Sequence, residues 1–153
     1  MLKKLLYVSV LAFLIAATGL LTLKEKLAIG PIVLGLTIVP LSGLLFARRS
    51  LKSTIPDLIF GSIDTGLLTI PALYGGVLFG VAGAIAGGII GDALTDGITG
   101  FFEGSISEWL RQRGIEESRE AITTSLGKMA GCLLGSGLVL TVALFFGIRP
   151  EFY

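Results

Sequence analysis

The sequence contains no histidine and a single cysteine, Cys132, among its 153 residues. An intrachain disulfide therefore cannot form, and neither a Cys/His zinc site nor a haem site can be assembled. Cys132 lies in the apolar, glycine-rich run "GKMAGCLLGSG". We interpret it as a small buried side chain, because a free cysteine in such surroundings behaves as a small hydrophobic residue.

Charged residues are also scarce. They make up 15% of the chain, against about 25% in a typical soluble domain. The formal net charge is only +1, so nothing indicates nucleic-acid binding. Several apolar runs reach the roughly 20 residues that a helix needs to cross a bilayer. We therefore predict an all-α, polytopic helical protein of the lipid bilayer, as one domain too small to include a separate soluble module.

The apolar runs predict about five transmembrane helices with glycine-rich close packing. The expected spans are residues 4–22, 28–46, 56–73, 76–102 and 127–147. Residues 1–53 then hold two N-terminal helices, and residues 54–153 hold a core with an interfacial amphipathic helix near 104–122. Lys3 and Lys4 before the first run also suit a signal peptide. Because no cleavage site precedes the second run, we expect a retained helix, with cleavage as the alternative.

Local signals place the expected breaks. The stretch "STIPD", residues 53–57, begins a helix, since proline suits the first turn and an acid there faces the positive end of the helix dipole. The stretch "PALYGG", residues 71–76, predicts a break or tight turn. Trp109 is expected to anchor the amphipathic helix at the membrane interface.

Basic residues sort to one side of this topology. With five spans, nine of the twelve Lys and Arg residues fall on the side of the N-terminus. They are Lys3, Lys4, Arg48, Arg49, Lys52, Arg111, Arg113, Arg119 and Lys128. The opposite side holds Lys24, Lys26 and Arg149. The positive-inside rule then predicts a multi-pass protein of the cell (inner or plasma) membrane with a cytoplasmic N-terminus.

Small residues recur at helical spacing in the last two spans. In the fourth span, one row with a four-residue repeat is Gly76, Gly80, Ala84, Gly88, Asp92, Asp96 and Gly100. A second row, Gly83, Gly87 and Gly91, lies beside it. The fifth span repeats the pattern with Gly127, Gly131 and Gly135. Such rows let helix backbones approach closely in lipid. We predict close helix packing here, either within the chain or against a second copy. A homodimer is expected, because five short helices leave little room for a sealed pathway.

Three carboxylates interrupt the apolar run "GGIIGDALTDGITGFFEG". They are Asp92, Asp96 and Glu103, and no Lys or Arg lies between Lys52 and Arg111 to neutralise them. One carboxylate at the centre of a membrane costs at least about 2.5 kcal/mol on insertion scales. Intramembrane acids are therefore expected to bind an ion or to titrate. Glu103 lies near the inner boundary, where it is either an entry ligand or an interfacial charge.

The third span supplies a further acid, Asp64. Counted from Pro56 it lies about 12 Å along the helix. Counted back from Phe102, Asp92 lies about 15 Å in and Asp96 about 9 Å in. Three carboxylates on antiparallel neighbours thus reach a similar depth, if the two helices end at the same level.

Such a cluster needs a partner, because like charges in a low dielectric cannot all ionise without a cation or shared protons. Oxygen-only ligands suit hard cations such as Ca²⁺, Mg²⁺, Na⁺ or Mn²⁺. We predict an ion site formed by Asp64, Asp92 and Asp96, with Thr65 and Thr95 as auxiliary oxygens. The alternative is protonated acids that hydrogen-bond between helices. Lys128 is expected to reach the inner surface or, alternatively, to act as a counter-ion to these acids.

The sequence shows no arrangement of residues that is typical of an enzyme active site. No nucleophile and base stand at catalytic spacing, and there is no phosphate-binding loop. Asp92 and Asp96, one turn apart on one helix, are poorly placed as an opposing pair for water activation. We therefore expect neither an enzyme nor a tightly bound cofactor.

The order of these motifs resembles the transmembrane protein 65 family. The resemblance covers residues 59–140: "GSIDTGLL", then "AGAIAGGIIGDALTDGITGFFEG", a spacer with "LRQRGI", and "LGKMAGCLLG". The matching positions are Asp64, Asp96, Glu103, Gly127, Lys128, Gly131 and Cys132. Thr65 and Asp92 depart from the family pattern, which has asparagine at both positions, so this chain carries an extra carboxylate.

The resemblance implies cation exchange, because the animal member is a mitochondrial inner-membrane protein associated with sodium-dependent calcium efflux. The expected function is a membrane cation transporter, most simply a Na⁺/Ca²⁺ antiporter, with Ca²⁺ and Na⁺ as transported ions. Two alternatives stay open. One is a non-transporting adaptor or regulator of a partner transporter. The other is a proton-coupled Mg²⁺ or Mn²⁺ carrier, which differs by its pH dependence and its indifference to sodium.

Overall fold

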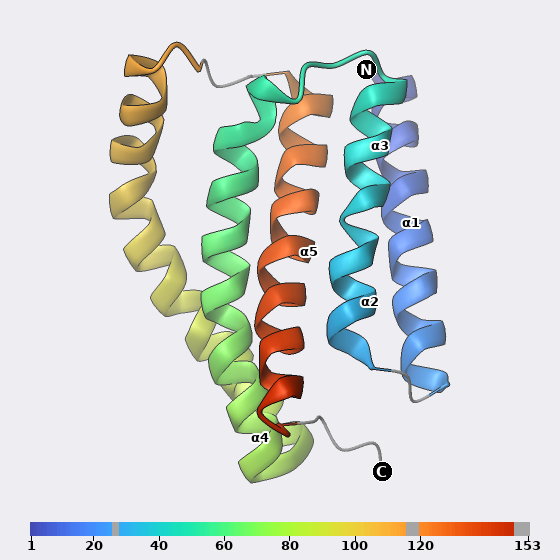
Figure 1. The fold of residues 1–153 in the computed structure, drawn as a ribbon, viewed down its shortest axis with the longest axis vertical. Coiled ribbons are helices and arrows are strands. Elements are labelled where there is room, and N and C mark those ends of the chain that lie inside the picture. Colours follow the sequence, from blue (N-terminus) through green and yellow to red (C-terminus); the bar gives the residue numbers. More distant parts are fainter. Residues whose placement is uncertain (26–27, 116–119, 149–153) are drawn as a thin grey trace.

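The computed structural model describes residues 1–25, 28–115 and 120–148, without the side chains of residues 101–103. The regular elements in these ranges are all helical, which confirms the predicted all-α class (Figure 1). In chain order they are α1 (Leu2–Lys24), α2 (Ile29–Leu36), α3 (Ile38–Phe46), the short 3₁₀ helix η1 (Lys52–Thr54), α4 (Ile55–Gln112) and α5 (Ala121–Phe145).

Among the described residues, four helical segments are long and apolar enough to cross a membrane: Leu2–Lys24, Ile29–Phe46, Lys52–Gly100 and Ala121–Phe145. The third has 49 residues, far more than the roughly 20 that one crossing needs. This segment folds back on itself at Gly80, so that α4 is a helical hairpin. We call residues 55–79 the first arm and residues 81–112 the second arm. With the hairpin counted as two passes, the chain has the five predicted membrane-length helices.

The reversal lies a turn beyond the stretch that predicted it. The chain stays helical through Pro71 and residues 71–76, and it turns at Gly80, where φ is 64° and ψ is −149°. This backbone conformation is essentially restricted to glycine. The ring of Pro71 lies against Gly91 of the other arm. A Cβ on Gly91 would stand 2.6 Å from the ring Cγ, so the glycine leaves room for the proline ring inside the hairpin. The chain therefore turns at Gly80 and not at the predicted residues 71–76, because glycine can adopt this backbone conformation and Pro71 stays within the helix.

The second expected span, residues 28–46, is divided. α2 ends at Leu36 and α3 begins at Ile38, with the buried Thr37 between them. Pro40 follows within one turn, and a proline cannot donate the backbone hydrogen bond that a continuous helix needs there. The fifth span begins six residues earlier than expected, at Ala121, so Lys128 lies inside α5 rather than at its start.

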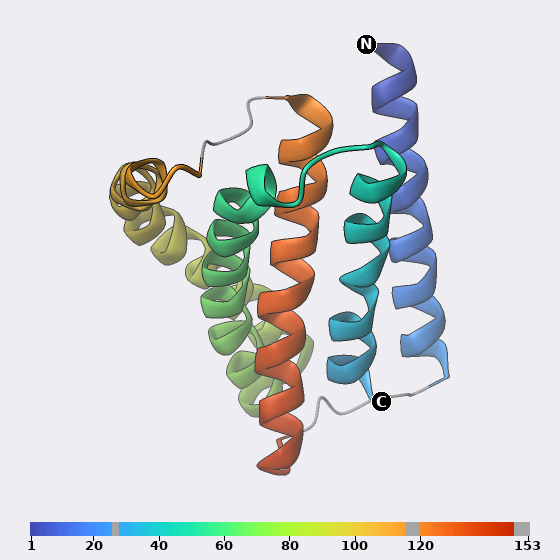
Figure 2. The same ribbon diagram turned by 45° about the horizontal axis from the view of Figure 1, so that its top comes forward.

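α5 stands at the centre of the molecule. α1, α2 and α3 lie on one side of it, and both arms of α4 lie on the other (Figure 2). Glycines make both contacts close. A Cβ on Gly131 would stand 2.5 Å from the carbonyl oxygen of Leu58 in the first arm, and one on Gly137 would stand 2.5 Å from the backbone nitrogen of Leu34 in α2. Small residues of this kind allow backbones to touch, which is how helices gain packing energy in lipid.

All described basic residues except Lys24 lie toward one end of the bundle. The N-terminus, the connection after α3, the end of α4 and the start of α5 meet at this end, while the turn at Gly80 and the end of α5 lie at the other (Figure 1). We call it the basic end. Lys26, Arg119 and Arg149 lie outside the described residues. Leu44, Ile122 and Leu126 form a buried apolar cluster close to this end.

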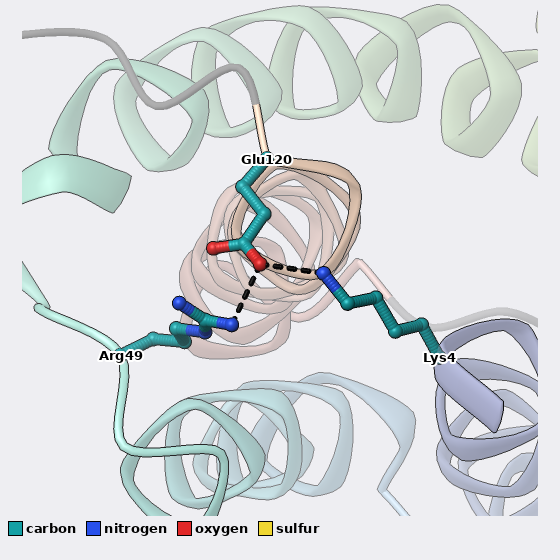
Figure 3. Close-up of polar contacts among 3 residues, drawn as sticks. All are labelled: Lys4, Arg49 and Glu120. Carbon is teal, nitrogen blue, oxygen red and sulfur yellow. Dashed lines mark hydrogen bonds and ion pairs between the residues drawn. The ribbon is translucent and has the colours of Figure 1, made fainter. Parts of the chain in front are cut away.

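An ion-pair network ties three segments together at the basic end (Figure 3). One carboxylate oxygen of Glu120 accepts from Lys4 Nζ at 2.7 Å and from Arg49 Nη2 at 2.6 Å. The hydrogen bond from Lys4, together with the positive charges of Lys4 and Arg49, lowers the pKa of Glu120 below its ordinary value of 4.5. The network joins α1, the connection after α3, and the start of α5.

Candidate functional site

A groove of about 640 Å³ lies between the two arms of α4 and α5. It runs from the turn at Gly80 to Asp92 on the second arm, between Leu68 and Val77 on the first arm, with Leu140 of α5 at its side. Asp92 lies about 18 Å along the second arm from the turn, at 1.5 Å per residue. In a hydrocarbon core of about 30 Å this is near mid-depth.

The groove owes its width to one row of small residues. Gly76, Gly80, Ala84, Gly88 and Asp92, the four-residue repeat of the sequence, all line it. A Cβ on Gly88 would meet nothing within 4 Å. These positions therefore leave space between the arms instead of closing it.

The second row makes the contact between the arms. A Cβ on Gly83 would collide with the carbonyl of Gly75, and a Cβ on Gly87 with the carbonyl of Pro71. The next positions of this row, Gly91, Thr95 and Thr99, are also buried. The second arm thus packs on the first arm through this row, and Asp92 and Asp96 lie beside the contact rather than in it.

The glycines of α5 face the first arm rather than the second. Gly127 lies against Thr54 and Asp57, Gly131 against Leu58, and Gly135 against the backbone of Ser62. The first arm is therefore packed between α5 and the second arm. Three glycines of the fourth span were also predicted to pack. A Cβ on Gly76 would stand 3.4 Å from the Cβ of Ala84, an ordinary contact, whereas a Cβ on Gly80 or Gly88 would meet no atom within 4 Å.

The register of the arms sets the levels of the acids. Gly83 lies beside Gly75, and Gly87 lies beside Pro71. The arms are antiparallel, so a step of four residues toward the C-terminus on the second arm corresponds to a step of four residues toward the N-terminus on the first arm. Continued for eight more residues on each arm, this register puts Thr95 level with Ile63, the residue before Asp64. Asp92 and Asp96 flank that level on the exposed side of the second arm.

The three predicted acids differ in their surroundings. Asp64 is half-buried, and its Oδ1 is buried without a hydrogen-bond partner. Asp92 and Asp96 are exposed, and Asp92 lines the groove. No group of three acidic, histidine or cysteine side chains among the described residues is arranged to hold a metal ion. The register thus places Asp92 and Asp96 within about one helical turn of Asp64 along the arms, and the described residues do not join the three in one coordination cluster.

Each predicted auxiliary residue has one oxygen bonded within its own helix. The hydroxyl of Thr95 donates to the carbonyl oxygen of Asp92 at 3.1 Å, whereas in Thr65 it is the backbone carbonyl oxygen that accepts, from Thr69 at 2.6 Å. Glu103 has a side chain outside the described part of the chain. Threonine hydroxyls remain acceptors while they donate, so Thr95 retains lone pairs for a cation.

Thr69 and Ser136 are polar residues outside the predicted ligand set. Thr69 lines the groove, and its Oγ1 lies 3.0 Å from Ser136 Oγ of α5. Thr69 is one helical turn beyond Thr65, which was a weak signal for it. Ser136, inside "GSG", gave none, because only the packing of α5 on the first arm brings it here.

Positive charge is absent from the groove. No Lys or Arg is among the residues that line it. Lys128 is exposed, and its Nζ stands 5.4 Å from the ring centre of Phe60, on the first arm near the basic end. Asp92 therefore faces an apolar groove without a basic residue on its walls.

Comparisons with known proteins returned nothing: no family model matches the chain, and no curated protein and no solved structure matches it either. The comparisons therefore add nothing to the geometry and chemistry of the candidate site.

Proposed function

We propose that the chain is a membrane cation transporter that exchanges Na⁺ for Ca²⁺ through intramembrane carboxylates. The proposal places it in the cell membrane with the basic end toward the cytoplasm. The observation that supports it most is Asp92, a carboxylate on the wall of a groove near mid-depth, with no basic residue on the walls. The resemblance to the transmembrane protein 65 family supports the same activity.

The chemistry follows from the cost of burying charge. A carboxylate at this depth must share a proton or a cation, because the apolar walls cannot solvate it. The available ligands are oxygens, which favour hard cations. Ca²⁺ takes six to eight oxygens, more than Asp92 and Thr69 supply. Water in the groove, or the carboxylates of Asp64 and Asp96 about one helical turn away along the arms, would complete the coordination.

Exchange requires one site that opens alternately to the two sides, and no other chemistry. Gly80 is a natural hinge, since its backbone conformation already departs from the helix. The arms separate toward the Gln112 end in both views (Figures 1 and 2). A movement of the second arm toward the first would bring Asp92 and Asp96 closer to Asp64. Competition of Na⁺ and Ca²⁺ for shared carboxylates would then couple their fluxes.

The test is ⁴⁵Ca²⁺ uptake into liposomes that contain only this purified protein, with and without a sodium gradient. We expect sodium-driven uptake that is abolished in Asp64→Asn, Asp92→Asn and Asp96→Asn. Glu108→Gln is the matched control, because Glu108 is an exposed acid of the same arm that pairs with Arg111. Wild-type uptake by the Asp64→Asn protein would overturn the site. Uptake of Mg²⁺ or Mn²⁺ that follows pH and ignores sodium would favour the proton-coupled carrier.

A second candidate, a membrane adaptor without transport, is favoured by the uncovered side of the second arm. Gly97, Gly100 and Gly104 have no heavy atom within 4 Å of a Cβ position, unlike the glycines of α5 that face the first arm. A partner helix or a second copy in a homodimer would fit against them. The adaptor predicts that function survives neutralisation of the acids and is lost when Gly80, Gly88 or Gly131 is made bulky.

A further inference from the structure

We infer that the groove between the arms of α4 binds an organic cation with apolar substituents. This inference goes beyond the exchange of inorganic ions and does not depend on it. It begins from the shape of the groove. A volume of about 640 Å³ lies within the range of small-molecule sites, roughly 300 to 1,000 Å³.

The walls are almost entirely apolar. The larger side chains that line the groove are Leu68, Leu73, Val77, Val81, Ile89 and Leu140. The glycines and the alanine of the first row, with Ala72, form most of the remaining wall. The groove therefore has polar side chains only at the end where Thr69 and Asp92 lie. Such walls favour a ligand that buries hydrocarbon, at about 25 cal/mol for each Å² of apolar surface removed from water.

The polar end determines the charge of the ligand. Asp92 is the one acidic residue among those lining the groove, and no basic residue accompanies it there. Thr69, the polar neighbour, is already hydrogen-bonded to the carbonyl oxygen of Thr65 and to the hydroxyl of Ser136. A neutral hydrocarbon would leave the carboxylate without a counter-charge. A cation with apolar groups satisfies both ends of the groove.

A bare divalent ion is a poorer occupant of the groove as it stands. Ca²⁺ needs six to eight oxygen ligands, and the side chains that line the groove supply the oxygens of Asp92 and Thr69. A monovalent onium ion needs one counter-charge and apolar contacts. The charge and the surface of the groove therefore point to the organic cation.

The experiment measures binding of [³H]tetraphenylphosphonium to the purified full-length protein in detergent. Wild-type protein should bind it saturably, with one site per chain. Asp92→Asn and Gly88→Leu should each weaken the Kd by about tenfold or more, the first by removing the charge and the second by filling the space. Two matched controls on the same arm lie outside the groove: Glu108→Gln and Gly97→Leu should leave the Kd within about twofold of wild type.

A second probe tests the charge without any substitution. Tetraphenylsilane, which is neutral and carries the same four phenyl groups around a tetrahedral centre, should bind the wild-type protein at least about tenfold more weakly than the phosphonium ion. Gel filtration of each variant establishes that it is folded. Equal affinity for the two probes, or loss of binding in Gly88→Leu alone, would mean that the groove takes a neutral chain such as a lipid tail, and would overturn the inference. Unchanged binding in both groove variants, or none in wild type, would overturn it as well.

Discussion

Thr69 of the first arm is hydrogen-bonded to Ser136 of α5, with 3.0 Å between the two hydroxyl oxygens. The bond forms where the glycines of α5 have already brought the two backbones together, since Gly135 lies against the backbone of Ser62. It joins α5 to the first arm at the edge of the groove. The second arm takes no part in it and contacts the first arm through its own glycine row.

Loss of this hydrogen bond should weaken the fold modestly. We expect Thr69→Val to lower the free energy of unfolding by about 0.6 kcal/mol, the average for hydrogen bonds between membrane helices. Thermal unfolding in detergent, followed by circular dichroism, measures the change. Thr18→Val is the matched control, because Thr18 is exposed and bonds only to the carbonyl of Leu14 in its own helix. Equal losses in the two variants would show that the bond to α5 contributes nothing.

The contact of α5 with the first arm should not tolerate a side chain. In Gly131→Leu the new Cβ would lie 2.5 Å from the carbonyl oxygen of Leu58 and 3.0 Å from the Cα of Gly61, both of them backbone atoms that cannot move aside. We expect a loss of about 3 kcal/mol or more, or failure to fold. Gly97→Leu, at an open position, should retain a wild-type elution volume and melting temperature. Similar behaviour of the two variants would contradict the packing.

The hairpin should depend on glycine at its turn. Gly80 has a φ of 64° and a ψ of −149°, which an L residue adopts only at a cost of about 1 to 3 kcal/mol. Gly80→Ala should therefore lower the melting temperature although its Cβ meets no atom within 4 Å. Gly88→Ala, in helical backbone with equal space, should be neutral or slightly stabilising, because alanine is the better helix former. A neutral Gly80→Ala would mean that the turn lies elsewhere.

Sequence and structure diverge most at this hairpin. Hydropathy predicted the number of passes, because a helix in lipid must satisfy its backbone internally and its length is set by the bilayer. The turn was expected near Pro71, since a local signal cannot tell which of several glycines adopts a positive φ. The sequence also could not predict which glycine row contacts the other arm and which lines the groove. Both rows have the same spacing, and only the placement of the partner helices makes one a contact and the other a groove.

The levels of the acids were easier to predict than their surroundings. Helix rise alone places Asp64, Asp92 and Asp96 at similar depths in two antiparallel helices. Whether they form one cluster depends on the rotation of each helix and on the angle between the arms, and the sequence encodes neither in a local pattern. Thr69 and Ser136 were missed for the same reason, since they come from segments far apart in the chain.

The ion pairs of Glu120 predict a pH dependence of stability. The pKa of Glu120 is lowered in the folded protein, chiefly by the hydrogen bond from Lys4. A carboxyl group with a lowered folded pKa stabilises the protein above its unfolded pKa, and this stabilisation is lost as the pH falls through the folded pKa. Glu120→Gln should therefore melt at a lower temperature than wild type at pH 7. The difference should disappear in acid below the ordinary value of 4.5.

Salt and a matched variant test the same network. The residues are partly exposed, so 1 M NaCl should reduce the difference at pH 7 by screening. Glu108→Gln breaks the exposed pair with Arg111 within one helix and should change the melting temperature less, because it joins no separate segments. A difference between Glu120→Gln and wild type that persists unchanged at pH 3 would rule out the carboxylate as its source.

Asp64 should separate stability from transport. Its Oδ1 is buried without a hydrogen-bond partner, and a buried polar group in that state costs about 1 to 3 kcal/mol. Asp64→Asn removes the charge and keeps the shape, so we expect it to raise the free energy of unfolding by about 1 kcal/mol while it abolishes sodium-driven Ca²⁺ uptake. Asp57→Asn is the comparison: Asp57 is buried in the first turn of α4, where a negative charge favours the helix, and its neutralisation should destabilise. A protein stabilised by Asp64→Asn that has lost uptake would show a residue kept for function at the expense of the fold. Destabilisation by Asp64→Asn would instead indicate that this carboxylate serves the packing of the arms.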